Sequence, residues 1–296
     1  MKYVITGGAG NISKPLAATL LAAGHEVTVI GRSAENLASL VALGARAAIG
    51  TVEDAAFLAQ AFAGADAVYT MVPPQYAALG LDDYQQVGAR YAEAIRVNHI
   101  RYVVNLSSVG AHLPAGVGPV SGLYRVEQEL NKLSDTHVLH LRPGFFYSNF
   151  FGNIGMIKGL DLIGGNYGDS NARMVLSHPA DIAAAAAREL TELSFRGQSV
   201  RYLASDERTT GDVARVLGAA VGKPALPWVA FTDEQAQGGL AQAGLPPTMV
   251  DKYVEMGQAI RTGIMWEDFL QQRPQQFGAT RLEDFAPAFA AAYGAG

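Results

Sequence analysis

Short apolar runs and helical patterns alternate along the first 150 residues of the chain. Runs rich in β-branched residues are expected to form strands, and segments with apolar residues three to four positions apart are expected to form helices. The predicted strands span residues 3–5, 26–30, 45–49, 67–70, 101–106 and 137–141. The predicted helices between them span residues 14–23, 35–43, 55–62, 84–98 and 123–133.

This alternation predicts an α/β fold of the Rossmann type. Strand–helix–strand units with short connections close as right-handed crossovers, and they build a doubly wound parallel sheet with helices on both faces. The predicted strands are nearly continuous apolar runs, as expected when both faces of a sheet are covered. We therefore expect a dinucleotide-binding domain over residues 1–150.

The alternation of strand and helix patterns ends after residue 149. Residues 150–171 are rich in glycine and have little periodicity, so we expect a loop-rich crossing segment there. A helix over 180–193 and a strand over 199–203 follow, and part of 172–205 is expected to return to the Rossmann sheet. Further helices are expected over 212–221, 232–243 and 248–262. Residues 151–296 should thus form a smaller, mainly helical region on the substrate side.

Composition narrows the range of partners. The chain of 296 residues has a formal net charge of −5 and a pI near 5.7, which disfavours a broad surface for nucleic acid or anionic membranes. It has no cysteine, so disulfides, thiolate metal sites and cysteine nucleophiles are excluded. No apolar run is long enough to span a membrane, and the first strand starts too early to leave room for a signal peptide. We expect a cytoplasmic protein.

The strongest chemical signal is the run Thr6–Ser13 (TGGAGNIS), between the first predicted strand and its helix. A pyrophosphate needs free main-chain N–H groups at a helix N-terminus and no side chains in the way. Gly7 and Gly10 provide the tight turn and the close approach, and Asn11 and Ile12 open the helix. The alternative, a merely structural turn, is disfavoured because the run occupies the first strand–helix turn of an alternating chain.

The end of the second strand distinguishes the two nicotinamide dinucleotides. An acidic residue there accepts from the ribose 2′-hydroxyl of NAD, whereas an arginine holds the 2′-phosphate of NADP. Here Arg32 and Ser33 follow Gly31, and they offer a bidentate cation and a hydroxyl. The alternative is a solvated arginine in a loop. We favour NADP(H) as the cofactor.

Two further loops should contact the cofactor, because ligands bind at the carboxyl ends of parallel strands. Thr51 follows the third strand and is expected near the adenine. Val72 and Pro73 follow the fourth strand and are expected near the ribose or pyrophosphate.

Four segments together resemble the atypical short-chain dehydrogenase/reductases. These are the glycine loop, GRS at 31–33, NLSSVG at 105–110 and LRPGFF at 141–146. Within that family the chain is most similar to the NmrA-like branch, in which HPADIA at 178–183 also has a counterpart. The branch contains NADPH-dependent quinone reductases and redox-sensing regulators. The resemblance covers roughly residues 1–205.

The resemblance implies catalytic residues, and the sequence departs from them at one position. Catalytic members use a serine after the fifth strand and a Tyr-x-x-x-Lys helix. Ser108 and Tyr124 match the serine and the tyrosine, and Ser107 would contact the cofactor, but Gln128 stands where the lysine should be. A neutral amide cannot lower a phenol pKa from about 10, so Tyr124 could instead be a wall of the nicotinamide pocket.

The remaining candidates concern the substrate. His112 lies in the loop after the fifth strand and could face the substrate, although a structural role is the alternative. Phe145 and Phe146 begin an aromatic cluster that would suit a flat acceptor, but such clusters also form domain-interface core. No histidine pair or acidic cluster indicates a metal site.

Two functions remain open at this stage. The first is an NADPH-dependent oxidoreductase that delivers hydride to a small quinone- or enone-like acceptor. The second is an NADP(H)-binding redox sensor without turnover, which would act through a protein partner. Gln128 favours the second, and the commoner use of the fold favours the first.

Overall fold

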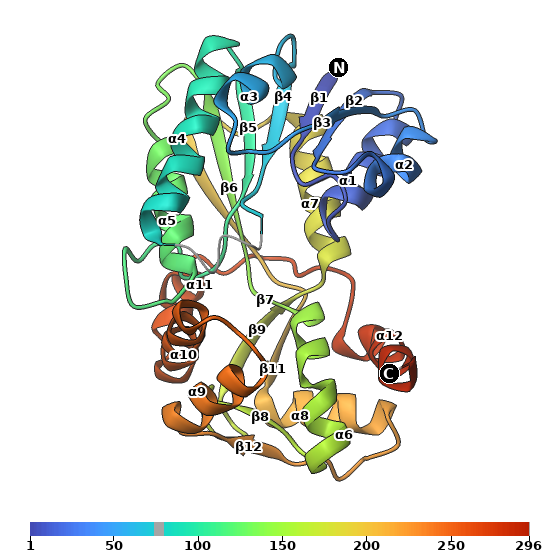
Figure 1. Cartoon of the computed structure of the whole chain (residues 1–296), viewed down its shortest axis with the longest axis vertical. Helices are drawn as coiled ribbons and strands as arrows, with labels where there is room; N and C mark the ends of the chain where they lie inside the picture. Colours follow the sequence, from blue (N-terminus) through green and yellow to red (C-terminus); the bar gives the residue numbers. More distant parts are fainter. Residues whose placement is uncertain (74–79, 296) are drawn as a thin grey trace.

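A computed structural model describes residues 1–73 and 80–295, and its upper half contains a seven-stranded parallel sheet (Figure 1). The strand order is β10-β6-β5-β4-β1-β2-β3, with every neighbouring pair parallel. The strands are β1 (Lys2–Ile5), β2 (Glu26–Gly31), β3 (Arg46–Ile49), β4 (Ala67–Thr70), β5 (Tyr102–Leu106), β6 (His137–Pro143) and β10 (Gln198–Leu203).

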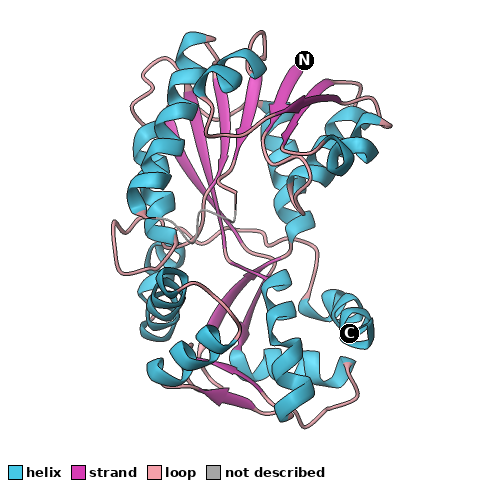
Figure 2. Ribbon diagram, viewed as in Figure 1, coloured by secondary structure: helices cyan, strands magenta, loops and turns pink. Residues whose placement is uncertain are grey.

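Helices cover both faces of this sheet (Figure 2). One face carries α3 (Ala55–Ala61), α4 (Leu81–Val97) and α5 (Val120–Leu130), and the other carries α1 (Ser13–Ala22), α2 (Ala34–Val41) and α7 (Pro179–Glu192). Alternation along the strands serves both faces: in β1, Tyr3 and Ile5 pack on the side of α1, and Val4 packs on the side of α4. The predicted Rossmann-type doubly wound sheet is confirmed.

The strand order reverses between β1 and β4, and this reversal fixes where a ligand binds. Chain direction takes β1 to β2 on one side and β4 to β5 on the other, and in open α/β sheets a ligand binds in the crevice at such a reversal. The loops after β1 and β4 are linked, because the main-chain N–H of Met71 donates to Thr6 Oγ1 at 3.0 Å. The crevice at the carboxyl ends of these strands is the position for a dinucleotide.

Capping side chains and a proline explain where several helices begin. The Asp54 carboxylate accepts from the N–H of Phe57 and caps α3, and the Thr209 hydroxyl accepts from the N–H of Asp212 at the start of the helix that follows it. Helix α7 has Pro179 at its first turn, where a missing N–H costs nothing.

The lower half of the molecule has its own core, and it contains two small sheets as well as helices (Figure 2). One sheet has the order β11-β9-β7 and the other pairs β12 with β8. The strands are β7 (Phe145–Phe146), β8 (Ile163–Gly165), β9 (Arg173–Ser177), β11 (Asp206–Thr209) and β12 (Trp228–Ala230). The helices are η2 (Tyr147–Asn153), α6 (Ile154–Leu160), α8 (Thr210–Ala220), α9 (Asp233–Gln242), α10 (Pro247–Thr262), η3 (Ile264–Trp266), α11 (Glu267–Gln271) and α12 (Leu282–Ala295).

One prediction for this half needs correction. The loop-rich segment expected over 150–171 contains η2, α6 and β8, because its apolar residues pack on the lower core even though its glycines hide any periodicity. The region after residue 150 is mainly helical, as expected, and it also holds five strands among the described residues. One of them, β10, pairs in parallel with β6 in the main sheet. The domain limits at residue 150 stay a prediction.

Candidate dinucleotide and acceptor site

The glycine loop after β1 has a geometry that only glycine allows. Gly7 has φ +65°, and a Cβ there would lie 2.6 Å from Met71 Sδ. A Cβ on Gly8 would lie 3.0 Å from Leu37 Cδ2, and the N–H of Gly10 donates to the carbonyl of Gly7 at 2.8 Å. The loop is therefore a tight turn in which Gly7 and Gly8 leave no room for a side chain of their own.

The N-terminus of α1 follows this turn without a side-chain cap. Ile12 occupies the N-cap position and supplies no side-chain hydrogen bond, and Asn11 beside it is exposed. Ser13 stands where a third glycine is usual, and its hydroxyl donates to the carbonyl of Thr6 at 2.9 Å. The serine thus fits by bonding to the strand. In the first helical turn Pro15 has no N–H, and the N–H groups of Lys14 and Leu16 donate to the carbonyls of Gly10 and Ile12, so the N–H groups that remain for an anion precede Lys14.

Arg32 and Ser33 lie at the carboxyl end of β2, beside the glycine loop. Arg32 is exposed, and no carboxylate within the described residues forms an ion pair with it. Ser33 is the N-cap of α2, yet its hydroxyl makes no capping bond. A cation and a hydroxyl that no group within residues 1–73 and 80–295 engages are suited to bind a phosphate.

The loops after β3 and β4 border the same crevice. Thr51 is half-buried, and its hydroxyl accepts from the N–H of Glu53 at 3.3 Å. Val72 and Pro73 are half-buried in the loop after β4. The structure therefore places these predicted residues at the expected edge of the sheet.

The two serines after β5 have different surroundings. Ser107 is buried, and its hydroxyl donates to Glu127 Oε1 at 2.5 Å. Its N–H donates to the carbonyl of Leu141, so a cofactor contact by the Ser107 side chain, as the sequence predicted, competes with an existing bond. Ser108 is half-buried, and its hydroxyl has no hydrogen-bond partner among the described residues. Ser108 is the serine available to a ligand.

Tyr124 lies on α5 and has no cationic partner. Its side chain is half-buried, Gln128 one turn further is exposed, and no hydrogen bond joins Tyr124 to another of the described residues. An acid/base tyrosine requires a lysine or another cation beside it. The part of the chain that the structure describes provides no such bonded partner for Tyr124. Tyr124 stays a candidate for the nicotinamide pocket wall.

His112 faces a charged cluster. Its Nδ1 is buried without a hydrogen-bond partner among the described residues. Burial lowers the pKa of His112, and the charges of Asp268 and Arg142 act on it in opposite directions. A contact of His112 with a substrate stays a prediction, since these charged neighbours support the structural alternative.

That cluster of buried charges is a feature which sequence reasoning missed. Arg142 on β6 forms a bidentate pair with Glu127 on α5, with N–O distances of 2.6 and 3.0 Å, and both side chains are buried. Arg142 also reaches Tyr202 and Asp268. Burial opposes the charge, but hydrogen bonds to Glu127 raise the pKa of Arg142. The available signal was a charge at an apolar strand position and an acid on an apolar helix face.

The aromatic segment after β6 lies between the two cores. Phe145 packs against the lower core and Phe146 against the core under α1 and α7. The Phe145 ring lies 5.3 Å from that of Phe150 and 5.9 Å from that of Tyr167. Burial raises the pKa of Tyr167 to about 12, so its phenol is neutral. An apolar, uncharged wall therefore stands where the two halves meet.

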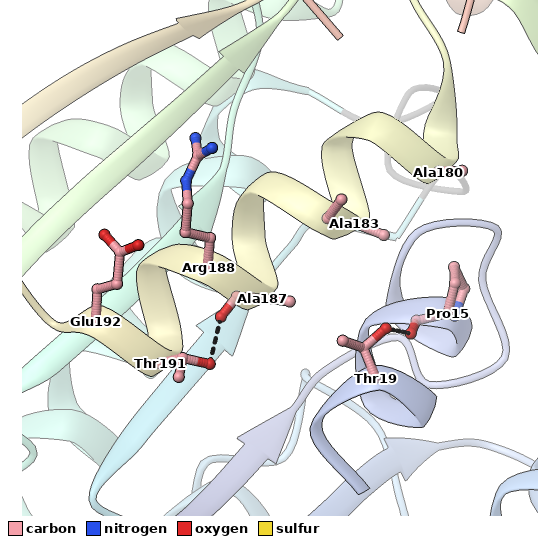
Figure 3. Close-up of a pocket in the computed structure, with 9 residues that line it drawn as sticks. Pro15, Thr19, Ala180, Ala183, Ala187, Arg188, Thr191 and Glu192 are labelled. Atoms are coloured by element: carbon pink, nitrogen blue, oxygen red, sulfur yellow. Dashed lines mark hydrogen bonds between the residues drawn. The ribbon is translucent and has the colours of Figure 1, made fainter. Parts of the chain in front are cut away.

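A shallow groove between α1 and α7 lies away from these residues (Figure 3). It has a volume of about 530 Å³ and is lined by four alanines of α7, with Pro15, Thr19, Arg188, Thr191 and Glu192 around them. Thr19 and Thr191 bond to carbonyls of their own helices, so the groove offers few free polar groups. It is not part of the predicted site.

Within residues 1–73 and 80–295, no group of three or more His, Asp or Glu side chains could hold a metal ion. No helix in the same ranges combines the length and the apolar character that crossing a membrane requires.

Comparison with known proteins identifies relatives over the whole chain. The profile of a family described as NAD(P)H-binding matches residues 7–167, more than half of the chain. The NAD(P)H azoreductase of Xenophilus azovorans is 26% identical over 296 residues, which cover 99% of each protein.

Solved structures share the fold at lower identity. The NADPH-dependent quinone oxidoreductase of Escherichia coli, complexed with NADPH, has a TM-score of 0.82 and 20% identity, over 97% of this chain and 99% of that one. NmrA, a negative transcriptional regulator in complex with NAD, has a TM-score of 0.75 and 13% identity, over 99% of this chain and 97% of that one. The Rossmann-type fold therefore extends to reductases and to a regulator.

Proposed function

Since the chain belongs to the NAD(P)H-binding family, we propose that it is an NADPH-dependent oxidoreductase which reduces a planar, conjugated acceptor such as a quinone or an enone. The family confirms the predicted cofactor class as NAD(P)H. The fold shared with NmrA and a quinone oxidoreductase agrees with the predicted resemblance to the NmrA-like branch.

The residues at the sheet edge fit a dinucleotide with a 2′-phosphate. Gly7 and Gly10 leave the main chain open to the pyrophosphate, at the uncapped N-terminus of α1. Arg32 and Ser33 would hold the 2′-phosphate, and Thr51 would lie near the adenine. The single observation that carries the choice of NADPH over NADH is the exposed Arg32 without a carboxylate partner among the described residues.

The nicotinamide end of the site favours reduction of an acceptor. When bound, NADPH supplies a hydride, and with one proton from water a quinone becomes a hydroquinone while NADP⁺ forms. Ser108 would donate a hydrogen bond to the acceptor oxygen, and Tyr124 would form a wall. Oxidation of an alcohol needs a base to take the hydroxyl proton, and no cation among the described residues bonds to Tyr124 to make it one.

The aromatic side chains support a flat acceptor. Phe145 and Tyr167 form an uncharged wall at the junction of the two halves, where a conjugated ring would stack. An azo group, which the name of the Xenophilus relative specifies, belongs to the same class of planar, electron-poor acceptors. The flat shape and the lack of charge of these side chains therefore favour a planar acceptor.

A redox sensor is the second candidate, and the unpaired Tyr124 favours it. Purified protein with NADPH and a panel of quinones, enones and azo dyes separates the two functions. Loss of nicotinamide absorbance at a rate proportional to protein concentration, faster with NADPH than with NADH, supports the reductase. Tight NADPH binding without turnover on every acceptor favours the sensor and refutes the reductase.

A further inference from the structure

The guanidinium of Arg142 has no free donor. Its five N–H groups reach Glu127 Oε1 at 3.0 Å, Glu127 Oε2 at 2.6 Å, the Ala111 carbonyl at 3.3 Å, Tyr202 Oη at 2.9 Å and Asp268 Oδ2 at 3.2 Å. The Tyr202 hydroxyl in turn donates to Asp268. A fully occupied guanidinium holds each acceptor in one place, because no donor is left for an alternative bond.

This arrangement holds both ends of the turn that follows β5. At one end, Glu127 accepts from the Ser107 hydroxyl at 2.5 Å. At the other end, the Ala111 carbonyl accepts from Arg142 directly. Ser108 lies between the two anchors, with its hydroxyl free of protein partners among the described residues. The position of Ser108 therefore depends on groups that lie beneath the turn.

The same cluster connects the turn to the other half of the molecule. Asp268 belongs to α11 in the lower half, and its side chain is only 21% exposed. Three segments thus meet at Arg142: the turn after β5, helix α5 and helix α11. In Figure 1, α11 lies below α5, at the junction of the halves. Docking of α11 and placement of the turn are linked through one cation.

We propose that Glu127, Arg142 and Asp268 are positioning residues, which hold the 107–111 turn so that Ser108 faces the nicotinamide only when α11 is docked. The proposal rests on the proposed function for the identity of the ligand. It differs from a purely structural ion pair, because it makes the order of the turn depend on a residue of the lower half.

Two mild variants test this, since removing one charge of the buried Glu127–Arg142 pair risks unfolding. Ser107→Ala removes the hydroxyl anchor, and Asp268→Asn removes the charge on α11 but keeps an acceptor oxygen. Asp161→Asn is the matched control, because Asp161 pairs with Lys223 on the exposed surface of the lower half. Amide hydrogen exchange of residues 107–111 is measured without cofactor, and the fluorescence of bound NADPH and kcat are measured with it.

The expected result is specific to the turn. Both variants should exchange amides of the turn at least tenfold faster than the control, while global unfolding midpoints stay close to wild type. Bound NADPH should lose the fluorescence of an ordered nicotinamide, and kcat should fall about tenfold with less than a threefold change in the Kd for NADPH.

Two results would overturn the proposal. One is unchanged exchange of the turn in Asp268→Asn, which would show that α11 does not order it. The other is faster exchange with NADPH fluorescence and kcat equal to the control, which would show that the turn does not position the nicotinamide. If wild-type protein has no turnover, the proposed function fails, and exchange and fluorescence still decide the role of the cluster.

Discussion

Replacing Arg32 with alanine should weaken NADPH binding and leave NADH binding almost unchanged. Arg32 is exposed at the end of β2 and has no carboxylate partner among the described residues, so its charge is free to bind the 2′-phosphate. Hydrogen bonds between charged groups contribute about 1.5–3 kcal/mol, and about 1.4 kcal/mol changes a dissociation constant tenfold. The Kd for NADPH should therefore rise about 10- to 100-fold.

The same reasoning predicts what must not change. The Arg32 side chain makes no hydrogen bond within the described protein, so the free energy of unfolding should stay within about 0.5 kcal/mol of wild type. Arg46→Ala is the matched control, because Arg46 is also exposed but begins β3. It therefore lies at the amino ends of the strands, away from the carboxyl ends where Arg32 lies. The control should bind both cofactors like wild type.

Calorimetric titration of the three proteins with NADPH and NADH gives the six dissociation constants that decide the matter. Added salt should weaken NADPH binding to wild type more than to Arg32→Ala, because it screens the exposed charge. Equal losses of affinity for NADPH and NADH would refute the assignment of Arg32 to the 2′-phosphate, as would no loss for either.

Three further predictions concern the glycine loop, α5 and the buried polar groups. Gly7→Ala should raise the Kd for NADPH and destabilise the fold by about 1–2 kcal/mol, because φ is +65° and Met71 lies in the way; Gly24→Ala, at φ +82° with open space, should leave the Kd unchanged in the same titration. Tyr124→Phe should lower kcat less than threefold in a steady-state assay, and a loss above a hundredfold would restore Tyr124 as an acid/base. Burial lowers the pKa of His140, so the unfolded chain takes up more protons as pH falls through about 6.5, and stability present above that pH is lost below it. Denaturant midpoints between pH 7.5 and 5 check the loss, and an NMR titration placing the His140 pKa above 6.5 would contradict it.

The tautomer of His140 follows from its neighbours. The Thr70 hydroxyl donates to Asn105 Oδ1, so the Asn105 amide is left to donate to His140 Nδ1 at 3.1 Å. The ring therefore carries its proton on Nε2, which donates to Asn131 Oδ1 at 2.9 Å. This chain of bonds crosses β4, β5 and β6 and uses the neutral form of the imidazole, in agreement with its lowered pKa.

The upper half could be predicted because each of its elements has a local signal. Strands buried on both faces are continuous apolar runs, and the glycine loop sits where the first strand ends. Even β10 was expected as a short strand over 199–203, although Val200 is its single β-branched residue. Element ends shifted by a few residues, as at α4, which starts at Leu81 because Asp83 accepts from the N–H of Gly80 and closes its first turn.

The lower half could not be predicted to the same degree, because its strands are short and one of them, β11, is made mostly of charged residues. β11 consists of Asp206, Glu207, Arg208 and Thr209, and no apolar alternation marks it as a strand. Its pairing with β9 is antiparallel and depends on contacts distant in sequence. Local residue propensities therefore do not predict the β11-β9-β7 sheet.

The predictability of the site residues likewise depended on how close together they lie in the sequence. Gly7, Gly10 and Arg32 follow from a motif that is contiguous in sequence. The cluster around Arg142 joins residues 15 and 126 positions apart, so spacing could not reveal it.

The most direct test of the central claim is hydride transfer in a single turnover. The protein is mixed anaerobically with one equivalent of NADPH that carries deuterium at either the 4R or the 4S position, and then with an excess of a quinone. The account predicts loss of nicotinamide absorbance in one exponential phase, slowed severalfold by deuterium at one of the two positions and unaffected by the other. NADPH that stays bound and unoxidised with every acceptor would contradict the account.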